Sequence, residues 1–381
     1  MRRVETPNWG LMRFLIDRRV CVLAALGFAT LASLIPANAQ DAKQQITKQI
    51  NQVEKRIQSG PDSDQNWKEA KPNLLKTLAA ARESVSAGRT LFALIQLNAV
   101  VTDLTGLESL AGNPEIVRGG APAFEKEWKR IDLELAKYGQ RYRDGRWDGK
   151  PAALRAIAEA SWVESRALYE ASKPYAAATE VQYGLYYLGR SRGNAEYSLF
   201  CLGLNLSAAK PAPSYRSLAP ELEVLQNRVI AAYQPPASID HHQEFIQLNA
   251  AIKTAKELDA AKLYFGSLYK YLDAVRLFAL LDAKTPDPQN ASELANEASS
   301  QHKDFAAATV DDSIGEIFAE RADAALEAFR ADNKDVAKLK AARVALDVVI
   351  PAYLAAIEKP LPAAVPAGHI INVTLVRWPY T

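Results

Sequence analysis

Residues 41–58 read DAKQQITKQINQVEKRIQ, and this stretch decides the fold class. Its apolar residues Ile46, Ile50, Val53 and Ile57 follow one another at intervals of four, three and four. This spacing places them in one narrow stripe along an α-helix. Such a helix is stable only when the stripe packs against other helices, so the stretch predicts a helical bundle or array.

The same period continues through most of the chain. It predicts further helices over 64–87, 89–110, 123–142, 151–172, 174–188, 194–206, 221–233, 238–257, 259–282, 291–329 (interrupted near 309–312) and 336–357. Loops are predicted at 112–122 and 284–289, and Pro351 is expected to kink or split the last helix. We therefore predict an all-α fold, a multi-helix array of antiparallel helical hairpins forming one elongated domain or two bundles.

Three stretches resemble one another, each with a helix end, a small or aromatic turn region and a second apolar helix. They are Ala81–Leu97, Ala167–Leu188 and Ala260–Leu281. They predict helical hairpins, but they lack the 34-residue period and the residue spacing of tetratricopeptide repeats.

Residues 207–220, with three prolines, predict a connection between an N-terminal helical half at 40–206 and a C-terminal half at 221–358. The segment 359–381 begins with a proline-rich linker. Ile371, Val373 and Leu375 then alternate with more polar residues, which predicts one β-strand. This strand could lie along the bundle or add to a sheet of another molecule.

The N-terminal segment has the organisation of an export signal. Basic residues follow Met12, an apolar run covers Val20–Ile35, and Ala37-Asn-Ala39 fits a cleavage site. We predict a signal peptide over 1–39, with translation starting at Met1 or Met12, and a periplasmic or secreted location. The apolar run has 16 residues, fewer than the roughly 20 of a membrane span. No membrane span is therefore expected in the mature chain.

The charge balance excludes one class of partner. Residues 1–39 contain five of the 46 basic and two of the 44 acidic residues, so the remaining 342 residues have a formal net charge of −1. This balance gives no electrostatic reason to bind nucleic acid. Only Cys201 remains in the mature chain. It predicts no internal disulfide and a buried thiol that acts as a small apolar side chain.

Two glycine motifs are similar to motifs of hydrolases and of phosphate-binding loops. Gly189-Arg-Ser-Arg-Gly193 matches the Gly-x-Ser-x-Gly of a hydrolase nucleophile. The chain lacks the series of buried strands that such an elbow needs, so a turn between helices is expected. Gly184–Ser191 imitates a phosphate loop, but its bulky Leu-Tyr-Tyr-Leu cannot present backbone N–H groups as small residues do.

The histidines suggest no metal site. His241 and His242, within Asp240–Glu244, would point about 100° apart on a helix, and no Glu-x-x-His or His-Glu-x-x-His occurs. Ser238 or Asp240 is instead expected to cap a helix start. We predict neither a metal nor a cofactor.

Other polar and aromatic patterns have structural alternatives. Asp312, Glu316 and Glu320 share a helix face and could serve general acid–base catalysis, but a solvated face is the expectation. Two aromatic stripes could line a groove for peptide or glycan, but helical spacing favours the core. They are Tyr183, Tyr186 and Tyr187, and Tyr264, Phe265, Tyr269 and Tyr271.

The segment Arg141–Asp148 is the strongest candidate for a binding surface. Tyr142, Arg143, Arg146 and Trp147 combine aromatic rings, which stack on sugars, with guanidinium groups, which pair with carboxylates. A structural turn is the alternative.

From these observations we predict a non-enzymatic, exported helical scaffold or binding protein of the cell envelope. Its partner would be a protein or an envelope polymer, bound through a helical surface. Two alternatives stay open: an enzyme that acts on glycan or cell wall through a tyrosine-lined groove, and a helical bundle that binds a small ligand.

Overall fold

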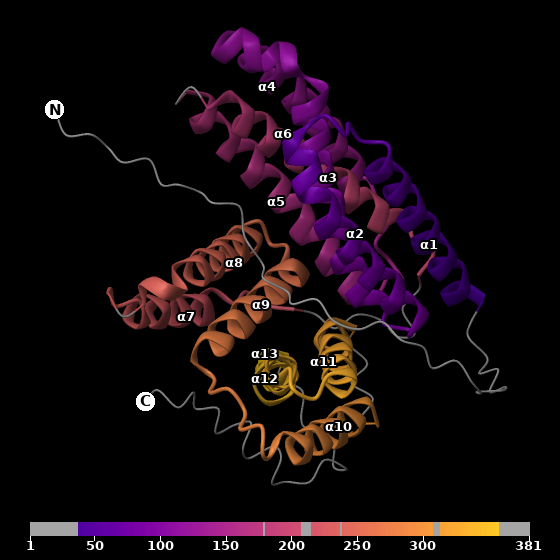
Figure 1. Cartoon of the computed structure of the whole chain (residues 1–381), viewed down its shortest axis with the longest axis vertical. Helices are drawn as coiled ribbons and strands as arrows, with labels where there is room; N and C mark the ends of the chain where they lie inside the picture. The colour runs from indigo at the N-terminus through magenta and orange to yellow at the C-terminus, as the bar shows by residue number, and fades with distance from the viewer. Residues whose placement is uncertain (1–36, 178–179, 207–214, 237, 308–312, 358–381) are drawn as a thin grey trace. The chain divides into compact units, whose positions relative to one another are not determined.

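A computed structural model describes residues 37–177, 180–206, 215–236, 238–307 and 313–357 (Figure 1). These residues form helices and loops, and no strand occurs among them. The predicted all-α fold is therefore confirmed. The elements are α1 (Ala37–Gln58), α2 (Gln65–Ser86), α3 (Thr90–Gly112), α4 (Pro114–Arg143), α5 (Ala152–Ala177), α6 (Val181–Gly203), α7 (Ala219–Ala232), η1 (Ile239–His241), α8 (His242–Ala260), α9 (Tyr264–Asp282), α10 (Ala291–Ala307), α11 (Ser313–Ala331), α12 (Val336–Val344), η2 (Ala345–Val349) and α13 (Ile350–Ala356).

Consecutive helices pack against each other as hairpins. The pairs are α2 with α3, α5 with α6, α8 with α9, and α11 with α12. Two of the turns have the same geometry. Gly88 and Lys262 have left-handed φ angles of 85° and 59°, and the next N–H groups, of Arg89 and Leu263, donate to helix carbonyls at 2.8 and 2.9 Å. The three similar stretches of sequence thus lie at the turns of the first three hairpins.

The sequence predicted a turn at the glycine motif 189–193, and this prediction is wrong. In the structure the motif lies in the middle of α6. Here α6 runs against α3 with little space between the backbones. A Cβ atom on Gly189 would lie 2.3 Å from the carbonyl oxygen of Thr105, and one on Gly193 would lie 2.0 Å from its Oγ1. The two glycines are therefore required for close packing of these helices.

Two other boundaries were also predicted wrongly. Residues 114–119 and 121–143 are the two helical parts of α4, and Gly120, at φ 65° and ψ −156°, interrupts the helix between them. Pro174 does not begin a helix but lies inside α5. The glycine signal at 119–120 thus marks a break at one residue and not a loop over 112–122.

The predicted effect of Pro351 is confirmed. A π-helical turn, η2, separates α12 from α13, and Pro351 lies in the first turn of α13. Proline has no N–H group to donate to the carbonyl four residues earlier, so the helix widens before it. The loop predicted at 284–289 is also observed.

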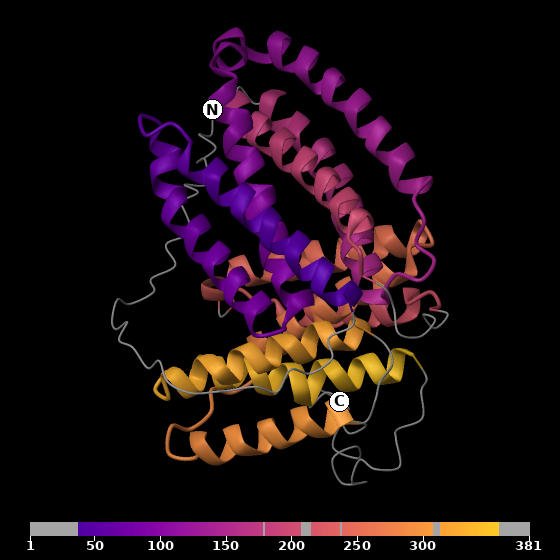
Figure 2. The ribbon, with the colours of Figure 1, turned by 90° about the vertical axis from the view of Figure 1, so that its right-hand side faces the viewer.

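One apolar core includes residues from before and after 207–220, among them Ile46, Leu97, Leu272 and Tyr353. Cys201 also belongs to it and is fully buried, as expected. Helices α10, α11 and the continuous segment α12–η2–α13 lie side by side (Figures 1 and 2). The division into halves at 40–206 and 221–358 stays a prediction.

Several predictions fall outside the described residues. These are the signal sequence up to residue 36, the interruption at 309–312, and the tail over 359–381. Among the described helices, α3 alone is long and apolar enough to cross a membrane by length and composition. Of its most apolar window, 61% is buried in the protein, which accounts for that composition.

The packing of α3 on α6 can be tested by adding one methyl group. Gly189→Ala places a Cβ against backbone atoms of Thr105 and Gly106, so the free energy of unfolding should fall by about 2–3 kcal/mol. Gly203→Ala, in the same helix, meets no atom within 4 Å and should change stability by less than about 1 kcal/mol. Urea unfolding measures both, and equal effects would contradict the close approach.

Candidate functional site

Seven charged side chains form three groups of ion pairs on five helices, and we call them the charged band. The carboxylates are Asp103 on α3, Glu164 on α5 and Asp273 on α9; the cations are Arg190 on α6, Lys270 and Arg276 on α9, and Arg321 on α11. They belong to all four hairpins, so the band is the first candidate for a site.

Within the charged band each cation is close to a carboxylate. Asp273 lies 2.8 Å from Arg276 and 3.2 Å from Arg321, and Lys270 pairs with Glu164. Burial alone would raise the pKa of Asp273, but the neighbouring Arg276, Arg321 and Lys270 outweigh it and keep that pKa well below its usual range. The pairs join helices to one another, but four cations share three carboxylates, and burial together with the neighbouring Arg276 lowers the pKa of Arg321.

Two buried carboxylates stabilise the starts of helices that cannot cap themselves. The residues before α3 and α9, Arg89 and Leu263, make no side-chain cap. Instead Glu320 on α11 accepts the N–H of Phe92 at 2.7 Å, and Glu159 on α5 accepts the N–H of Gly266 at 2.7 Å. A carboxylate at this position bonds an unsatisfied donor and interacts favourably with the helix dipole.

The carboxylates of α11 do not form the solvated face that was expected. Glu316 is exposed, but Glu320 is partly buried against α3, and Asp312 lies outside the described residues. Burial raises the pKa of Glu320 to about 8, assisted by the charge of Glu316 and opposed by the N–H of Phe92. Burial likewise raises the pKa of Glu159, opposed by Gly266 and Arg155. Both groups serve helix capping.

The four residues predicted to bind a partner divide between core and surface. Tyr142 is 6% exposed and stacks on Trp162, with ring centroids 5.9 Å apart. Trp147 is partly buried, 5.5 Å from the Tyr142 ring, while Arg143 and Arg146 are exposed. The structure thus brings the rings of Tyr142 and Trp147 together against the core and leaves the two arginines at the surface. Binding at these four residues stays a prediction.

Other candidate residues are placed as follows. Ser191 is fully buried in the interior of α6, which excludes it as an exposed nucleophile on a strand-to-helix elbow. His242 contacts the hydroxyl of Tyr233 at 3.0 Å, and no side-chain cap forms at the start of α8, contrary to the capping expected of Ser238 or Asp240.

The aromatic stripes separate by exposure. Tyr269 is 6% exposed and belongs to the core, as expected, whereas Tyr183 is 47% exposed. Tyr187 stacks on Tyr175 with ring centroids 4.9 Å apart, and Tyr186 donates a hydrogen bond to Asp103 at 3.3 Å. These contacts account for most of the stripe within α6 without a ligand.

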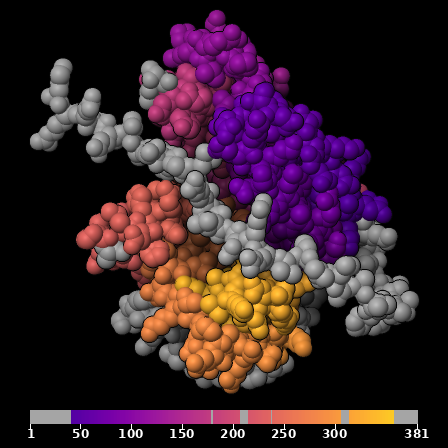
Figure 3. All heavy atoms as spheres, viewed as in Figure 1, coloured from indigo at the N-terminus to yellow at the C-terminus, as the bar shows by residue number. Residues whose placement is uncertain are grey.

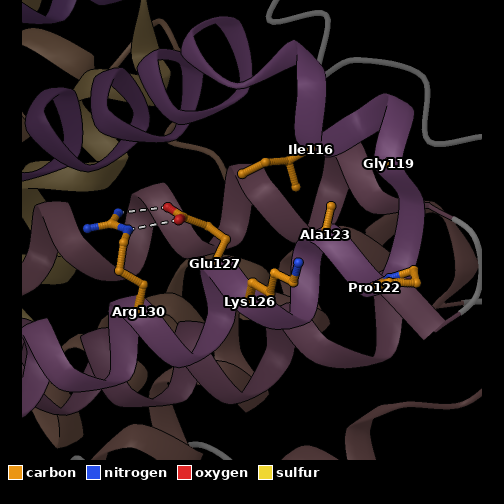
Figure 4. A pocket seen from close by; sticks show the side chains of 7 residues that line it. All are labelled: Ile116, Gly119, Pro122, Ala123, Lys126, Glu127 and Arg130. Atoms are coloured by element: carbon orange, nitrogen blue, oxygen red, sulfur yellow. Dashed lines mark hydrogen bonds and ion pairs between the residues drawn. The ribbon is translucent and has the colours of Figure 1, made fainter.

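A first pocket lies at the kink of α4 (Figure 4). Ile116, Pro122 and Ala123 supply apolar walls, and Lys126 extends along the opening. Arg130 is already paired with Glu127 at 2.7 Å. Since Lys126 is exposed, this hollow contains no buried polar group that would select a ligand.

A second pocket, of about 490 Å³, lies where α7 and α9 end and α8 begins, and we call it the α7–α9 pocket. Its volume falls within the range of about 300–1,000 Å³ that is typical of ligand sites. Its apolar residues are Ala231, Ala232, Phe245, Phe278 and Leu281; its polar residues are Arg228, Gln234, Ser238, His241 and Asp282.

Ser238 is a buried polar residue in the lining of the α7–α9 pocket. The residue is 8% exposed, and its hydroxyl has no hydrogen-bond partner among the described residues. A buried polar group without a partner costs about 1–3 kcal/mol. The residue lines the pocket, but its hydroxyl oxygen is itself covered, so a bound molecule could bond it only after a movement of the chain.

Large apolar side chains are exposed on the helices that line this pocket. Ile230 on α7 is 62% exposed, Ile239 on η1 is 59% exposed, and Ile246 on α8 is 38% exposed. Each is the chain neighbour of a residue that lines the pocket. Figure 3 shows α7 and α8, in salmon, at the surface of the molecule. Exposed apolar groups of this kind are typical of contact sites.

This region was not predicted, although the sequence contains a signal for it. In α7 the buried stripe is Leu222, Leu225 and Val229. Val224 and Ile230 lie off that stripe, so the helix has more apolar residues than one buried face requires. The pocket itself could not be predicted, because it depends on where three helix ends meet.

No family model, curated protein or solved structure matches this chain. Within the part of the chain that the structure describes, no group of three His, Cys, Asp or Glu side chains is placed to bind a metal ion. The α7–α9 pocket is therefore chosen as the candidate site from its geometry alone.

The burial of Glu320 predicts a pH dependence of stability. Its pKa is raised from an ordinary value of 4.5 to about 8 in the folded chain. The folded chain thus retains a proton that the unfolded chain releases, and the contribution of Glu320 to stability falls as the pH rises from about 4.5 to 8. Glu320→Gln cannot ionise, so its stability relative to the wild type should increase over this range.

Urea unfolding at pH 5, 6.5 and 8 measures this difference. Glu83→Gln, at an exposed position of α2, is the matched control and should show no trend with pH. A stability difference for Glu320→Gln that is equally flat would show that this carboxyl ionises without hindrance.

The unpartnered hydroxyl of Ser238 predicts an unusual response to truncation. Ser238→Ala removes a buried group that has no partner, so it should leave the free energy of unfolding unchanged or raise it by up to about 1 kcal/mol. Ser267→Ala is the control, because the Ser267 hydroxyl is fully buried and donates to the carbonyl of Ala255 at 3.1 Å. Its loss should cost about 1 kcal/mol. Equal costs in denaturant titrations would contradict this assignment.

Proposed function

We propose that this chain is an exported, non-enzymatic helical scaffold or binding protein that engages a partner of the cell envelope through a helical surface. The surface is formed by α7, η1 and the start of α8. Ile230, Ile239 and Ile246 are its exposed apolar residues, and the α7–α9 pocket opens beside them. The exposure of these side chains next to the pocket is the observation that carries the proposal.

The use of the buried carboxylates also supports a binding role. General acid–base catalysis needs carboxylates, or a histidine and a carboxylate, that converge on one concave site. Glu159 and Glu320 have raised pKa values, but each bonds the first turn of a different helix. Burial is the main cause of both raised pKa values, and the bonds to the N–H groups oppose it, so the raised values give no support to catalysis.

The N-terminal sequence supports an envelope location. A basic segment, a 16-residue apolar run and a small-residue site at Ala37-Asn-Ala39 have the pattern of an export signal. A helical array fits such a role, since packed hairpins present extended surfaces without a catalytic centre.

Site-specific photocrosslinking in the host tests the proposal. A photoreactive phenylalanine analogue at Ile230 or Ile239 should form a discrete adduct of higher mass, since a bound partner would lie within a few ångströms of these side chains. Mass spectrometry of the adduct identifies whether the partner is a protein or a polymer.

The control is the same analogue at Leu133, which is 68% exposed on α4, far from α7 in the sequence. The surface is wrongly assigned if Ile230 and Ile239 give no adduct, or if Leu133 gives the same adduct in equal yield.

A further inference from the structure

We infer that Arg276 on α9 and Arg321 on α11 form a binding site for the carboxylate group of a small organic acid. Neither residue lines the α7–α9 pocket, so this site is separate from the surface in the proposed function and does not depend on it. Three observations support the inference: two guanidinium groups share one carboxylate, neighbouring carboxylates do not compensate them, and nitrogens of both groups are open to solvent.

The two guanidinium groups bond the same oxygen atom. Oδ1 of Asp273 accepts hydrogen bonds from Nε and Nη2 of Arg276 at 3.0 and 2.8 Å, and from Nη1 of Arg321 at 3.2 Å. Among the described residues, Asp273 is the only carboxylate that pairs with either arginine. This group of three residues therefore has a surplus of one positive charge.

Neighbouring charged groups do not remove this surplus. Glu164 pairs with Lys270, so the two together add one charge of each sign. Glu320 precedes Arg321 in α11, but burial raises the pKa of its carboxyl to about 8, so this group is mostly uncharged at neutral pH. The site thus lacks a single negative charge.

A comparison of Lys270 with Arg321 shows which cation is left without compensation. Burial by itself would lower the pKa of both side chains. The carboxylate of Glu164 outweighs this effect at Lys270, whose pKa is raised. At Arg321 the charge of Arg276 acts in the same direction as burial, and Asp273 does not offset the two, so the pKa of Arg321 is lowered. An anion bound beside Arg321 would supply the missing compensation.

Nitrogens of both arginines remain available to a ligand. Nη1 of Arg276 and both Nε and Nη2 of Arg321 make no hydrogen bond to a described residue, and none of them is covered by the chain. The guanidinium group of Arg321 lies over the ring of Phe92, 5.5 Å from its centroid, so its face is occupied while its N–H edge is free. The two arginine side chains are 17% and 22% exposed, so the site is recessed and admits a small group.

A carboxylate fits this site by geometry and by charge. The N–H groups of a guanidinium are arranged to bond both oxygens of a carboxylate. A carboxylate has one negative charge, which equals the surplus at Arg276 and Arg321. A phosphate ester has about 1.5 to 2 negative charges at pH 7, which exceeds that surplus and would be repelled by Asp273.

NMR of the arginine Nε–H groups tests the inference on the full chain. Acetate is the probe and acetamide, of the same size, is the uncharged control; both are added to about 100 mM at constant ionic strength, because so small a ligand binds weakly. The signals of Arg276 and Arg321 should shift to saturation with acetate and not with acetamide. The signal of Arg118, at an exposed position of α4, should stay unchanged. Equal shifts at Arg118, or no saturable shift at the two arginines of the site, would overturn the inference.

Three variants separate the charge of the site from its hydrogen-bonding geometry. Arg321→Gln should weaken acetate binding at least tenfold, and Arg321→Lys, which keeps the charge without the planar fork, should weaken it about threefold. Asp273→Asn keeps an oxygen acceptor but removes the competing charge, so it should bind acetate at least threefold more tightly. Unchanged or weaker binding by Asp273→Asn would contradict a site that lacks one negative charge.

Arg118→Gln is the matched control for these variants and should bind acetate as the wild type does. Urea unfolding verifies that each variant is folded. The titration of the wild type needs no variant, so it decides the inference even where a substitution prevents folding.

Two other probes distinguish the source of the anion. Inorganic phosphate should bind less tightly than acetate, and tighter binding would reject the carboxylate assignment. A hexaglutamate peptide should shift the two signals no more readily than acetate at the same concentration of carboxylate. A shift at a tenfold lower concentration would mean that the site takes an acidic chain, which overturns the assignment to a small acid.

Discussion

The close approach of α3 and α6 is the contact on which the rest of the structure depends. Gly189 and Gly193 face Thr105 at distances that no side chain could occupy. The hydroxyl of Tyr197 then reaches the carbonyl of Leu94 at 2.5 Å and joins the two helices along their length. Since α3 belongs to the first hairpin and α6 to the second, this contact fixes the second hairpin against the first.

Charges complete the assembly that apolar packing begins. Arg89, just before α3, lies 3.0 Å from Asp323 and 2.6 Å from Glu327 on α11. Glu320 caps α3 from the same helix, so the fourth hairpin is bonded to the first. Glu159 on α5 likewise accepts an N–H group of the first turn of α9 and so joins these two helices. Polar contacts between helices are directional, so they select one arrangement among those that would bury a similar apolar area.

The charged side chains between the helices and the residues of the α7–α9 pocket differ in how far the fold satisfies them. The carboxylates and cations between the helices are mostly paired with one another. The α7–α9 pocket differs because Ser238 is left without a partner and Ile230 and Ile239 are left in water. Groups that lower the stability of a free chain are informative about binding, since a partner can recover what they cost.

The sequence by itself determined the all-α class, the hairpins and most helix boundaries, because a helix period depends on residues only three or four positions apart. It also identified Tyr269 and Cys201 as core residues. Only the tertiary structure decided that Gly189 lies inside a helix and that Glu320 is a cap rather than a solvated acid. The Glu320 contact joins residues 228 positions apart, and the Glu159 contact joins residues 107 apart. No local pattern encodes such pairs, and the same is true of a pocket formed where three helices end or begin.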